Sequence, residues 1–385
     1  MSHDVTIETL RVSDLGAPER ARWDSLRRAN PALGSPYFDL RYIDVAGAVA
    51  PGARIAILRR DGQIVGFLPH QRRGGLLQPL GAPMSDFHGL IAEVGAGLDL
   101  SALLRQIGAE RARVRGLIGE GQGDGAGTGL SLRHAMASDL SAGFEAYAAG
   151  RNASFLKDKR RRRRALERDH GPVIFSFERP DPERLDRIIE DKRRQLHRTH
   201  QYDIFACGWT GALLHRLAES TDPDFGLRLA TLTAGDVVVA AELGLTSGDR
   251  HHLWFPTYNT SYARYSPGSL MTLDTLRMAA EQGIRRVDFG PSEEAYKRDF
   301  ADPAEPVFEG LIHARPDQVS GLDRLPGLNR LSRRFDRIVA CEPGLMGQVR
   351  GTSAFVTAMG RRHPRLGAGL GLTLGLGLSL SALAD

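Results

Sequence analysis

The chain has 385 residues, of which 42% are hydrophobic and 25% are charged. This composition excludes a fibre and a wholly disordered chain, and the length favours two domains of ordinary size. The net charge of +5 indicates a modest preference for anionic partners. The only cysteines, Cys207 and Cys341, are far apart in sequence and lack metal-ligand spacing, which favours a reducing cytoplasm over a disulfide-stapled secreted protein.

The two ends of the chain bear on its location. Residues 1–15 contain three acidic side chains and no apolar core of signal-peptide length, so we expect a cytoplasmic protein, with the periphery of the inner membrane as an alternative. Residues 366–384 alternate Leu with Gly, Ser and Thr. Because glycine makes this segment a poor helix, we expect a disordered or loosely docked tail, with a membrane-associating segment as the alternative.

Two β-hairpins are predicted in different parts of the chain. The first joins residues 54–58 and 64–68 through Asp61-Gly62, and the second joins residues 227–232 and 237–241 through Gly235-Asp236. β-prone runs on both sides of such a pair are typical of a tight hairpin turn. The matched hairpins suggest an internal duplication, with chance similarity as the alternative interpretation.

The remaining elements predict an α+β protein built on a mixed sheet. The glycine-rich residues 119–129 indicate a linker. Hydrophobic spacing predicts helices at 140–169, 182–197 and 269–282, and strands at 173–177, 252–255 and 285–289. We expect an N-terminal domain at 1–135, a C-terminal catalytic domain at 140–315, and a helical extension with its tail at 316–385.

The sequence Tyr-Ser-Pro-Gly-Ser at residues 265–269 lies between a predicted strand and a predicted helix. Helix starts expose unpaired N–H groups and the positive end of the helix dipole, so this position suits a phosphate. Gly268 would let the backbone approach a ligand closely, and Arg264 could add a charge-assisted contact. A simple turn with a helix cap is the alternative interpretation.

From this loop through the Gly283 turn, Asp288-Phe289 and Tyr296-Lys297, the sequence resembles the GNAT-type acyltransferases of the CelD-like group, which are distant relatives of the FemAB aminoacyltransferases. The resemblance covers residues 140–300 and includes the basic helix at 157–168. It implies tandem GNAT-like folds, each a mixed, mostly antiparallel sheet flanked by helices, and acetyl-CoA or a similar acyl-CoA as donor.

The same resemblance implies a binding loop for the CoA pyrophosphate, formed by Arg264, Ser266, Gly268 and Ser269. The usual loop of the family has two residues between its Arg or Gln and the first Gly. Three residues separate Arg264 from Gly268, so this sequence departs from the family pattern at that point.

Three side chains are candidates for the chemistry of acyl transfer. Glu242 lies in an apolar strand, where burial would raise its pKa and produce a base near neutral pH; an edge strand with Glu242 in water is the alternative. Asp288 ends an apolar strand, and its position matches an acidic residue of the resembling family. Tyr296 follows that strand, where GNAT enzymes often place a tyrosine that protonates the thiolate, with a packed aromatic as the alternative. Lys297 is expected to neutralise a phosphate or an acidic substrate, since the Tyr-Lys pair fits the resembling family, with a surface lysine as the alternative.

Two other patterns bear on partners. His251 and His252 are adjacent on a predicted strand and face opposite ways, so we predict no metal site. The five arginines Arg160 to Arg164 indicate either a solvated helix or an anion site for a lipid-linked sugar phosphate, a membrane surface or tRNA. Because no aromatic residues interleave with them, we do not expect sequence-specific nucleic-acid binding.

The first hypothesis is therefore an N- or O-acyltransferase that acetylates a sugar or precursor of an exopolysaccharide or other cell-envelope polymer. That acceptor class comes from the resemblance alone. One alternative is a FemAB-like transferase that takes an aminoacyl group from tRNA, and another is a non-catalytic GNAT-like adaptor that binds a polyanion or a membrane. Acyl-CoA binding would support the first hypothesis, and salt-dependent tRNA binding would support the second. Absence of both kinds of binding would support the third.

Overall fold

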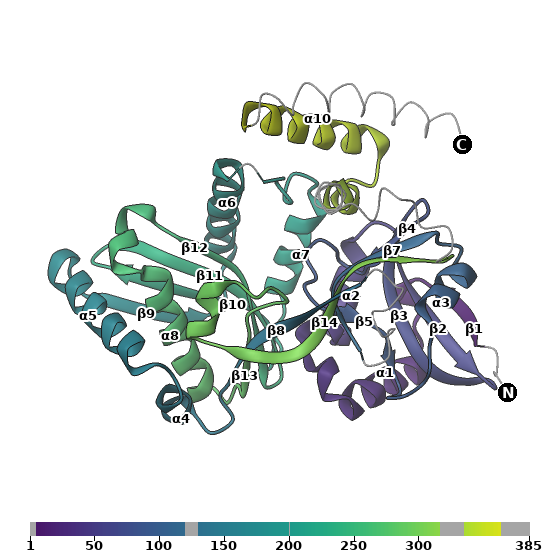
Figure 1. Ribbon diagram of the computed structural model, residues 1–385, viewed down its shortest axis with the longest axis horizontal. Coiled ribbons are helices and arrows are strands. Elements are labelled where there is room, and N and C mark those ends of the chain that lie inside the picture. The colour runs from purple at the N-terminus through teal and green to yellow at the C-terminus, as the bar shows by residue number, and fades with distance from the viewer. Residues whose placement is uncertain (1–4, 120–129, 200, 316–334, 363–385) are drawn as a thin grey trace.

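A computed structural model describes residues 5–119, 130–199, 201–315 and 335–362. One mixed, mostly antiparallel sheet runs through these residues, and helices flank it (Figure 1). In space its strands follow the order β1 (Thr6–Leu10), β2 (Ala53–Arg60), β3 (Gln63–Arg73), β4 (Leu76–Pro79), β7 (Arg111–Ile118), β14 (Asp302–His313), β8 (Ser131–Asp139), β13 (Arg286–Asp288), β12 (Arg250–Tyr258), β11 (Val237–Ser247), β10 (Phe225–Ala234) and β9 (Val173–Glu178). The short strands β5 (His88–Gly89) and β6 (Ile91–Ala92) pair with β7 and β3.

Both predicted hairpins are confirmed. Strands β2 and β3 pair antiparallel around Asp61 and Gly62, whose φ angles of 50° and 78° are those that a tight hairpin turn requires. Strands β10 and β11 pair antiparallel around Gly235, whose φ is 57°. Glycine tolerates this backbone without strain, which is why a glycine at the turn was informative in the sequence.

The order of elements repeats along the chain, in agreement with the duplication that the hairpins suggested. We call the segment from β1 to β8 the N-terminal repeat and the segment from β9 to β14 the C-terminal repeat. Each has a strand, two helices, three strands, a helix and two strands, and the N-terminal repeat adds the short strands β5 and β6 before its third helix. The helices are α1 (Ala17–Ala29), α2 (Leu40–Val49) and α3 (Leu100–Ile107) in the first repeat, and α6 (Pro182–Arg198), α7 (Trp209–Ala218) and α8 (Pro267–Glu281) in the second.

The two repeats exchange their last strands. Strand β14 of the C-terminal repeat pairs with β7 of the N-terminal repeat, and β8 of the N-terminal repeat pairs with β13 of the C-terminal repeat. In Figure 1, β14 crosses between the two halves of the molecule. The boundary predicted between residues 135 and 140 therefore falls at the end of a strand that is paired inside the other repeat.

The segment between the repeats forms helices α4 (Phe144–Ala149) and α5 (Ala153–His170) rather than one helix over 140–169. The break lies at Gly150, and α5 starts at Asn152, whose side-chain oxygen accepts hydrogen bonds from the amides of Ser154 and Phe155.

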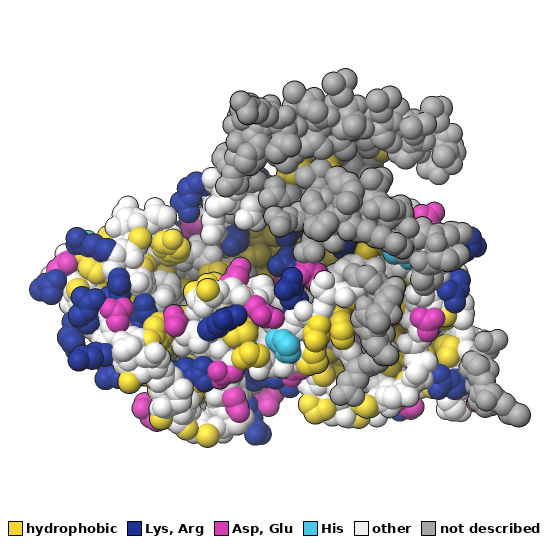
Figure 2. Space-filling model, in the orientation of Figure 1, with side chains coloured by type: hydrophobic (Ala, Val, Ile, Leu, Met, Phe, Trp, Pro, Cys, Tyr) yellow, Lys and Arg dark blue, Asp and Glu magenta, His cyan; other side chains and the backbone are white. Residues whose placement is uncertain are grey.

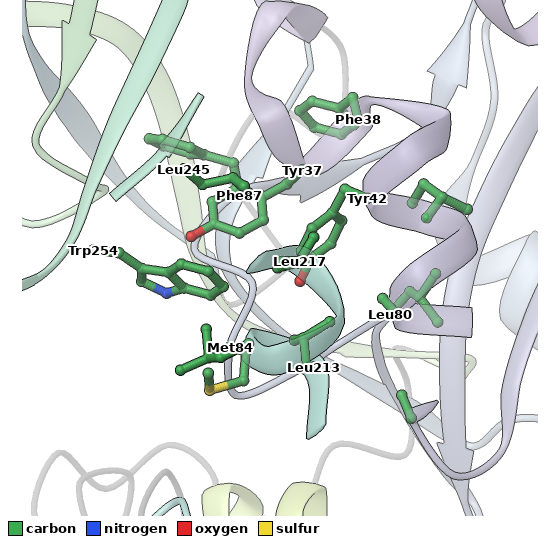
Figure 3. Packing of buried hydrophobic residues seen from close by; sticks show 14 of the residues in the cluster. Tyr37, Phe38, Tyr42, Leu80, Met84, Phe87, Leu213, Leu217, Leu245 and Trp254 are labelled. Atoms are coloured by element: carbon green, nitrogen blue, oxygen red, sulfur yellow. The ribbon is translucent and has the colours of Figure 1, made fainter. Parts of the chain in front are cut away.

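The largest hydrophobic core joins the two repeats. Tyr37, Phe38 and Tyr42 of the N-terminal repeat pack with residues of the C-terminal repeat that include Leu213, Leu217, Leu245 and Trp254 (Figure 3). Helices α2 and α7 contact each other in this layer. A second core lies on the other face of the C-terminal repeat, under α8 and α5.

The C-terminal extension contributes a helical segment at residues 335–341 and helix α10 (Leu345–Arg362). It contacts both repeats: the Asp336 carbonyl accepts from Gln78 at 2.8 Å, and the Cys341 carbonyl accepts from the Trp209 indole at 3.0 Å. Cys341 and Cys207 also come together, since both thiols donate to the Ile204 carbonyl, at 3.8 and 3.2 Å.

Within the described residues, no helix has both the length and the apolarity needed to cross a membrane. The Leu- and Gly-rich segment 366–384 lies outside the described residues, as does the predicted linker apart from its first residue, Gly119.

Candidate functional site

The candidate donor site begins where β12 and β13 separate. These parallel strands pair only at Arg250–Arg286, His251–Val287 and His252–Asp288. Strand β13 then ends, while β12 continues to Tyr258. In the described part of the chain, the second half of β12 has no partner strand on this side, although Lys192 of α6 donates to its Pro256 carbonyl at 3.4 Å. Such a strand edge leaves backbone groups for an extended ligand to bind.

The predicted phosphate loop follows directly after β12. The 3₁₀-helix η4 (Thr260–Tyr265) leads to Ser266, whose φ of 54° and ψ of 53° are left-handed, and α8 begins at Pro267. The first intrahelical bond runs from the Leu270 amide to the Ser266 carbonyl, so the amides of Gly268 and Ser269 precede it. A Cβ at residue 268 would meet nothing within 4 Å, which leaves room for a ligand against the backbone.

Helix α5 holds this loop in place. The Tyr265 hydroxyl donates to Asp169 at 2.7 Å, and Arg162 donates to the Arg264 carbonyl. The Arg264 guanidinium lies over the Tyr265 ring at 4.5 Å and donates to Asp169 at 3.3 Å, yet its side chain is 70% exposed. Arg264 is therefore placed beside the helix start with its charge open to solvent, as a phosphate contact requires.

Glu242 is buried in the middle of the C-terminal sheet. Strand β11 lies between β10 and β12, and the register pairs Glu242 with Ala230 and Pro256, so the alternative of an edge strand is wrong. Its side chain is 4% exposed. Burial raises the pKa of the carboxyl to about 8, and the nearby ammonium groups of Lys192 and Lys297 oppose that rise.

Tyr296 and Lys297 lie in the 3₁₀-helix η5 (Ala295–Asp299) that follows β13. Tyr296 is 53% exposed, and burial of its hydroxyl together with the charges of Glu294 and Glu242 raises its pKa. Tyr296 and Glu242 are therefore close enough for their charges to interact.

Lys297 is a buried residue, so the alternative of a surface lysine is wrong. Its Nζ donates to the Phe289 carbonyl at 2.6 Å and to Ser292 Oγ at 2.7 Å, and it lies 3.3 Å from the Glu294 carboxylate. These partners use the three donors of the ammonium group to hold the loop after β13. The geometry gives no support to the expected phosphate contact of Lys297.

Asp288 ends β13 and is 2% exposed. Its Oδ1 accepts from Arg286 Nε at 2.8 Å, and Arg286 also binds Glu305 at 2.6 Å. Its Oδ2 has no hydrogen-bond partner among the residues that the structure describes. The register places Asp288 beside His252, where the two strands separate.

A buried histidine and an aspartate that sequence reasoning missed lie at the same point. His252 Nε2 and Asp86 Oδ2 are 3.0 Å apart, with His252 fully buried and the Asp86 side chain 34% exposed. Burial opposes ionisation of Asp86, but the hydrogen bond with His252 and the charges of His252, Arg115 and Lys297 together hold the pKa of the carboxyl below its usual value. No motif around Asp86 indicated this role.

The two adjacent histidines face opposite ways, as strand alternation requires. The His251 ring bonds Thr246 at 2.8 Å and packs on Phe177, whereas the His252 ring packs on Tyr37 at 5.1 Å. Over the described ranges, no group of three or more His, Cys, Asp or Glu side chains could hold a metal ion.

The arginine run on α5 is unevenly exposed. Arg162 binds Asp158 at 2.7 Å and Arg163 binds Asp274 at 2.5 Å, so these two help to fix the helix. Arg160, Arg161 and Arg164 are exposed. Figure 2 shows Lys and Arg side chains gathered at the left end of the molecule, over α5.

Comparisons with known proteins place this geometry in context. The family model described as an acetyltransferase (GNAT) domain matches residues 153–298. The C-terminal domain (DUF2156) of a putative lysylphosphatidylglycerol synthetase from Agrobacterium fabrum has a TM-score of 0.50 and 13% identity, and the match covers 82% of this chain and 95% of that chain. This likeness shows a shared fold.

Two further solved structures have lower scores. A tandem GNAT protein from the clavulanic acid biosynthesis pathway has a TM-score of 0.48 and 12% identity, with 81% of this chain and 99% of that chain covered. FemX has a TM-score of 0.47 and 12% identity, with 78% of this chain and 96% of that chain covered. No curated protein matches the sequence.

Proposed function

We propose that this chain, whose residues 153–298 form an acetyltransferase domain of the GNAT type, transfers an acetyl group from acetyl-CoA to an amine or hydroxyl of a sugar. The domain match makes the protein an acyltransferase. The acceptor we propose is a sugar or a precursor of an exopolysaccharide or cell-envelope polymer, as in the CelD-like group that the sequence resembles. The observation that carries the proposal is the open α8 start beside the unpaired half of β12, next to the buried Glu242.

Donor binding would use backbone groups at two places. The amides of Gly268 and Ser269 at the start of α8, with the Arg264 guanidinium beside them and Ser266 leading into the helix, suit the CoA pyrophosphate. The unpaired edge of β12 suits the amides of the pantetheine arm, which can bond to a strand as another strand would. These two contacts would bring the thioester to the point where β12 and β13 separate.

The chemistry would then need one base and one acid. The acceptor nitrogen or oxygen attacks the thioester carbonyl, Glu242 takes its proton, the new C–N or C–O bond forms, and the C–S bond breaks. A carboxyl with a pKa of about 8 is a suitable base near neutral pH. Tyr296, whose pKa is raised, stays protonated at that pH and can give its proton to the leaving thiolate.

The test combines a binding variant and a chemistry variant. Gly268→Val should raise the Kd for acetyl-CoA about tenfold or more without unfolding the protein, because a side chain there meets no protein atom but crowds the phosphate. Glu242→Gln should leave that Kd within about twofold and lower the rate of CoA release about 100-fold or more.

Gly211→Ala is the matched control, because Gly211 lies in α7 and a Cβ there also meets nothing within 4 Å. Calorimetry gives the Kd, and a thiol assay gives the rate of CoA release. Wild-type affinity in Gly268→Val would contradict the loop assignment, and wild-type turnover in Glu242→Gln would contradict the base assignment.

A second part of the proposal concerns location. We propose a cytoplasmic protein that meets an anionic membrane surface or a lipid-linked phosphate through Arg160, Arg161 and Arg164 on α5. The exposure of these three arginines, at a helix that also holds the phosphate loop, is the observation that favours it. A FemAB-like use of aminoacyl-tRNA and a non-catalytic adaptor remain the alternatives that the acetyl-CoA measurement tests.

A further inference from the structure

A cavity of about 590 Å³, lined by both polar and apolar groups, lies between the N-terminal repeat and the C-terminal extension. Strands β4 and β7 of the N-terminal repeat form one wall, and the other side includes Thr199, Gln201, Tyr202, Asp336, Arg337 and Ala340. This volume is typical of a small-molecule site. The residues proposed for donor binding and for acyl transfer do not line this cavity. The cavity is therefore separate from the proposed donor site.

The charges of the lining balance. Arg113, Arg115 and Arg337 line the cavity together with Asp86, Glu309 and Asp336, and Arg113 and Asp336 are ion-paired at 2.5 Å. A polyanion would meet three carboxylates in this space, whereas hydroxyl groups can donate to the acids and accept from the arginines. The chemistry of the lining therefore favours a polyhydroxylated ligand without negative charge over a nucleic acid or a phosphate.

The Asp86 carboxylate connects the cavity to buried groups beneath it. Asp86 lines the cavity and is hydrogen-bonded at 3.0 Å to His252. Behind this pair, His252 Nδ1, the Tyr37 hydroxyl and Asp288 Oδ2 are buried and lack a hydrogen-bond partner in the part of the chain that the structure describes. Three such atoms around one histidine are unusual, since an unpaired buried polar atom destabilises the fold. A cluster of this kind is typical of a functional site.

The pair also lies beside the place where acyl transfer is proposed. His252 is the last residue of β12 that pairs with β13. Asp86 Oδ2 and His252 Cε1 come within 3.5 and 3.8 Å of where a Cβ on Gly290 would stand, directly after β13. The buried Lys297 is close enough to influence both Asp86 and Glu242. The cavity thus reaches the strand ends from the side of the N-terminal repeat.

We propose that this interdomain cavity binds the acyl acceptor, a sugar-sized polyhydroxylated molecule, with Asp86 accepting a hydrogen bond from the acceptor and His252 holding Asp86 in position. The assignment rests on the proposed acyltransferase function and adds the acceptor site and the residues that form it. It gives the N-terminal repeat a role: that repeat supplies Asp86 and the arginines of one wall, while the C-terminal repeat binds the donor.

The experiment measures acetyl transfer to D-glucosamine, with N-acetylglucosamine and glucose as further probes, in the full-length protein. Asp86→Asn and Arg115→Gln should each raise the KM for the sugar about tenfold or more, because each removes one charge-assisted contact, and leave the Kd for acetyl-CoA within about twofold. If Asp86→Asn does not fold, Arg115→Gln still tests whether the cavity binds the sugar. Asp44→Asn is the matched control, since Asp44 is 41% exposed and ion-paired to Arg20 away from the cavity.

The outcomes separate this proposal from the previous one. If wild type fails to bind acetyl-CoA, the proposed function fails. If wild type binds acetyl-CoA but Asp86→Asn and Arg115→Gln keep the wild-type sugar KM, the cavity assignment is overturned. Absence of binding by any of the three sugars, measured by saturation-transfer NMR on wild type, or tighter binding of tRNA that Asp86→Asn does not change, would overturn the ligand class.

Discussion

At the scale of single residues, Glu242 shows a cost of placing a base in a core. Its carboxyl has a pKa raised by burial from 4.5 to about 8, so the unfolded chain releases this proton at a lower pH than the folded chain does. As pH rises through that interval, the unfolded state gains the advantage of ionising first. The free energy of unfolding therefore falls as pH rises from about 4.5 to about 8, and the loss caused by Glu242 is largest above about pH 8.

Glu242→Gln removes this titration. We expect the variant to match wild type in unfolding free energy at about pH 5 and to exceed it by a few kcal/mol at about pH 9, since a shift of this size in a buried group corresponds to that order of energy. Urea denaturation at the two pH values measures the difference. Glu183→Gln is the control, because that side chain is 83% exposed. If the variant and wild type differed in unfolding free energy by the same amount at both pH values, Glu242 would not titrate as described.

The sequence predicted residues whose environment is local and missed those whose partners are distant. Glu242 could be recognised as buried because its neighbours along the strand are apolar, and Gly268 because it starts a helix. Asp86 could not be recognised, since its partner His252 is 166 positions away and nothing near Asp86 distinguishes it from a surface carboxylate. The burial of Lys297 could not be recognised for the same reason, because it depends on a loop that folds back over the side chain.

At the scale of elements, α5 carries charges that its own surroundings do not neutralise. Arg187 and Arg194 on α6 are more than 60% exposed but are paired with Glu183 and Glu190. On α5, Arg160 and Arg164 have no acidic partner in the ranges that the structure describes, and Arg161 shares Asp158 with Arg162. Helix α5 is therefore a better candidate for an anionic surface than α6, although both contain many arginines.

Replacing Arg160, Arg161 and Arg164 with glutamine should weaken binding to vesicles of phosphatidylcholine with about 30% phosphatidylglycerol by about 100-fold, since each cation near an anionic surface adds roughly 1 kcal/mol. The double variant Arg187→Gln, Arg194→Gln should change it little. Co-sedimentation at several salt concentrations gives the comparison. An equal loss in both variants would indicate a response to net charge alone, without a surface on α5.

Most elements of the C-terminal repeat followed from local patterns, because hairpin turns, helix caps and amphipathic spacing are encoded within a few residues. The segment 140–169 forms two helices and not the single predicted one, because Gly150 ends the first and Asn152 caps the second although the apolar spacing continues across the break. The pairing of β14 with β7 was beyond prediction. This pairing joins residues nearly 200 positions apart, and no sequence pattern in β14 indicates which strand it pairs with.

At the scale of the whole molecule, the extension is tied into the core that the two repeats share. Cys341 follows directly after the segment that lines the interdomain cavity, and its thiol and that of Cys207 donate to one carbonyl. Both sequence segments must move together if this wall of the cavity moves. The position of the extension therefore affects the space available to an acceptor.

A thiol oxidant such as diamide should join Cys207 and Cys341 within one chain, because their sulfur atoms already approach the same oxygen. Intact mass should fall by two hydrogen atoms, and the protein should migrate faster on a non-reducing gel. Cys207→Ser should abolish both changes. Formation of only intermolecular disulfides would show that the extension does not pack where the structure places it.

The exchange of β8 and β14 makes each repeat incomplete without the other. A single repeat on its own would leave the edge of its penultimate strand open, and a second copy would be the natural source of the missing strand. Joining both repeats in one chain replaces that encounter between two molecules with one inside a single molecule, whose effective concentration is set by the connecting segment that contains α4 and α5. The exchange therefore completes itself equally well in a dilute or a crowded solution, as a symmetric pair of separate repeats could not.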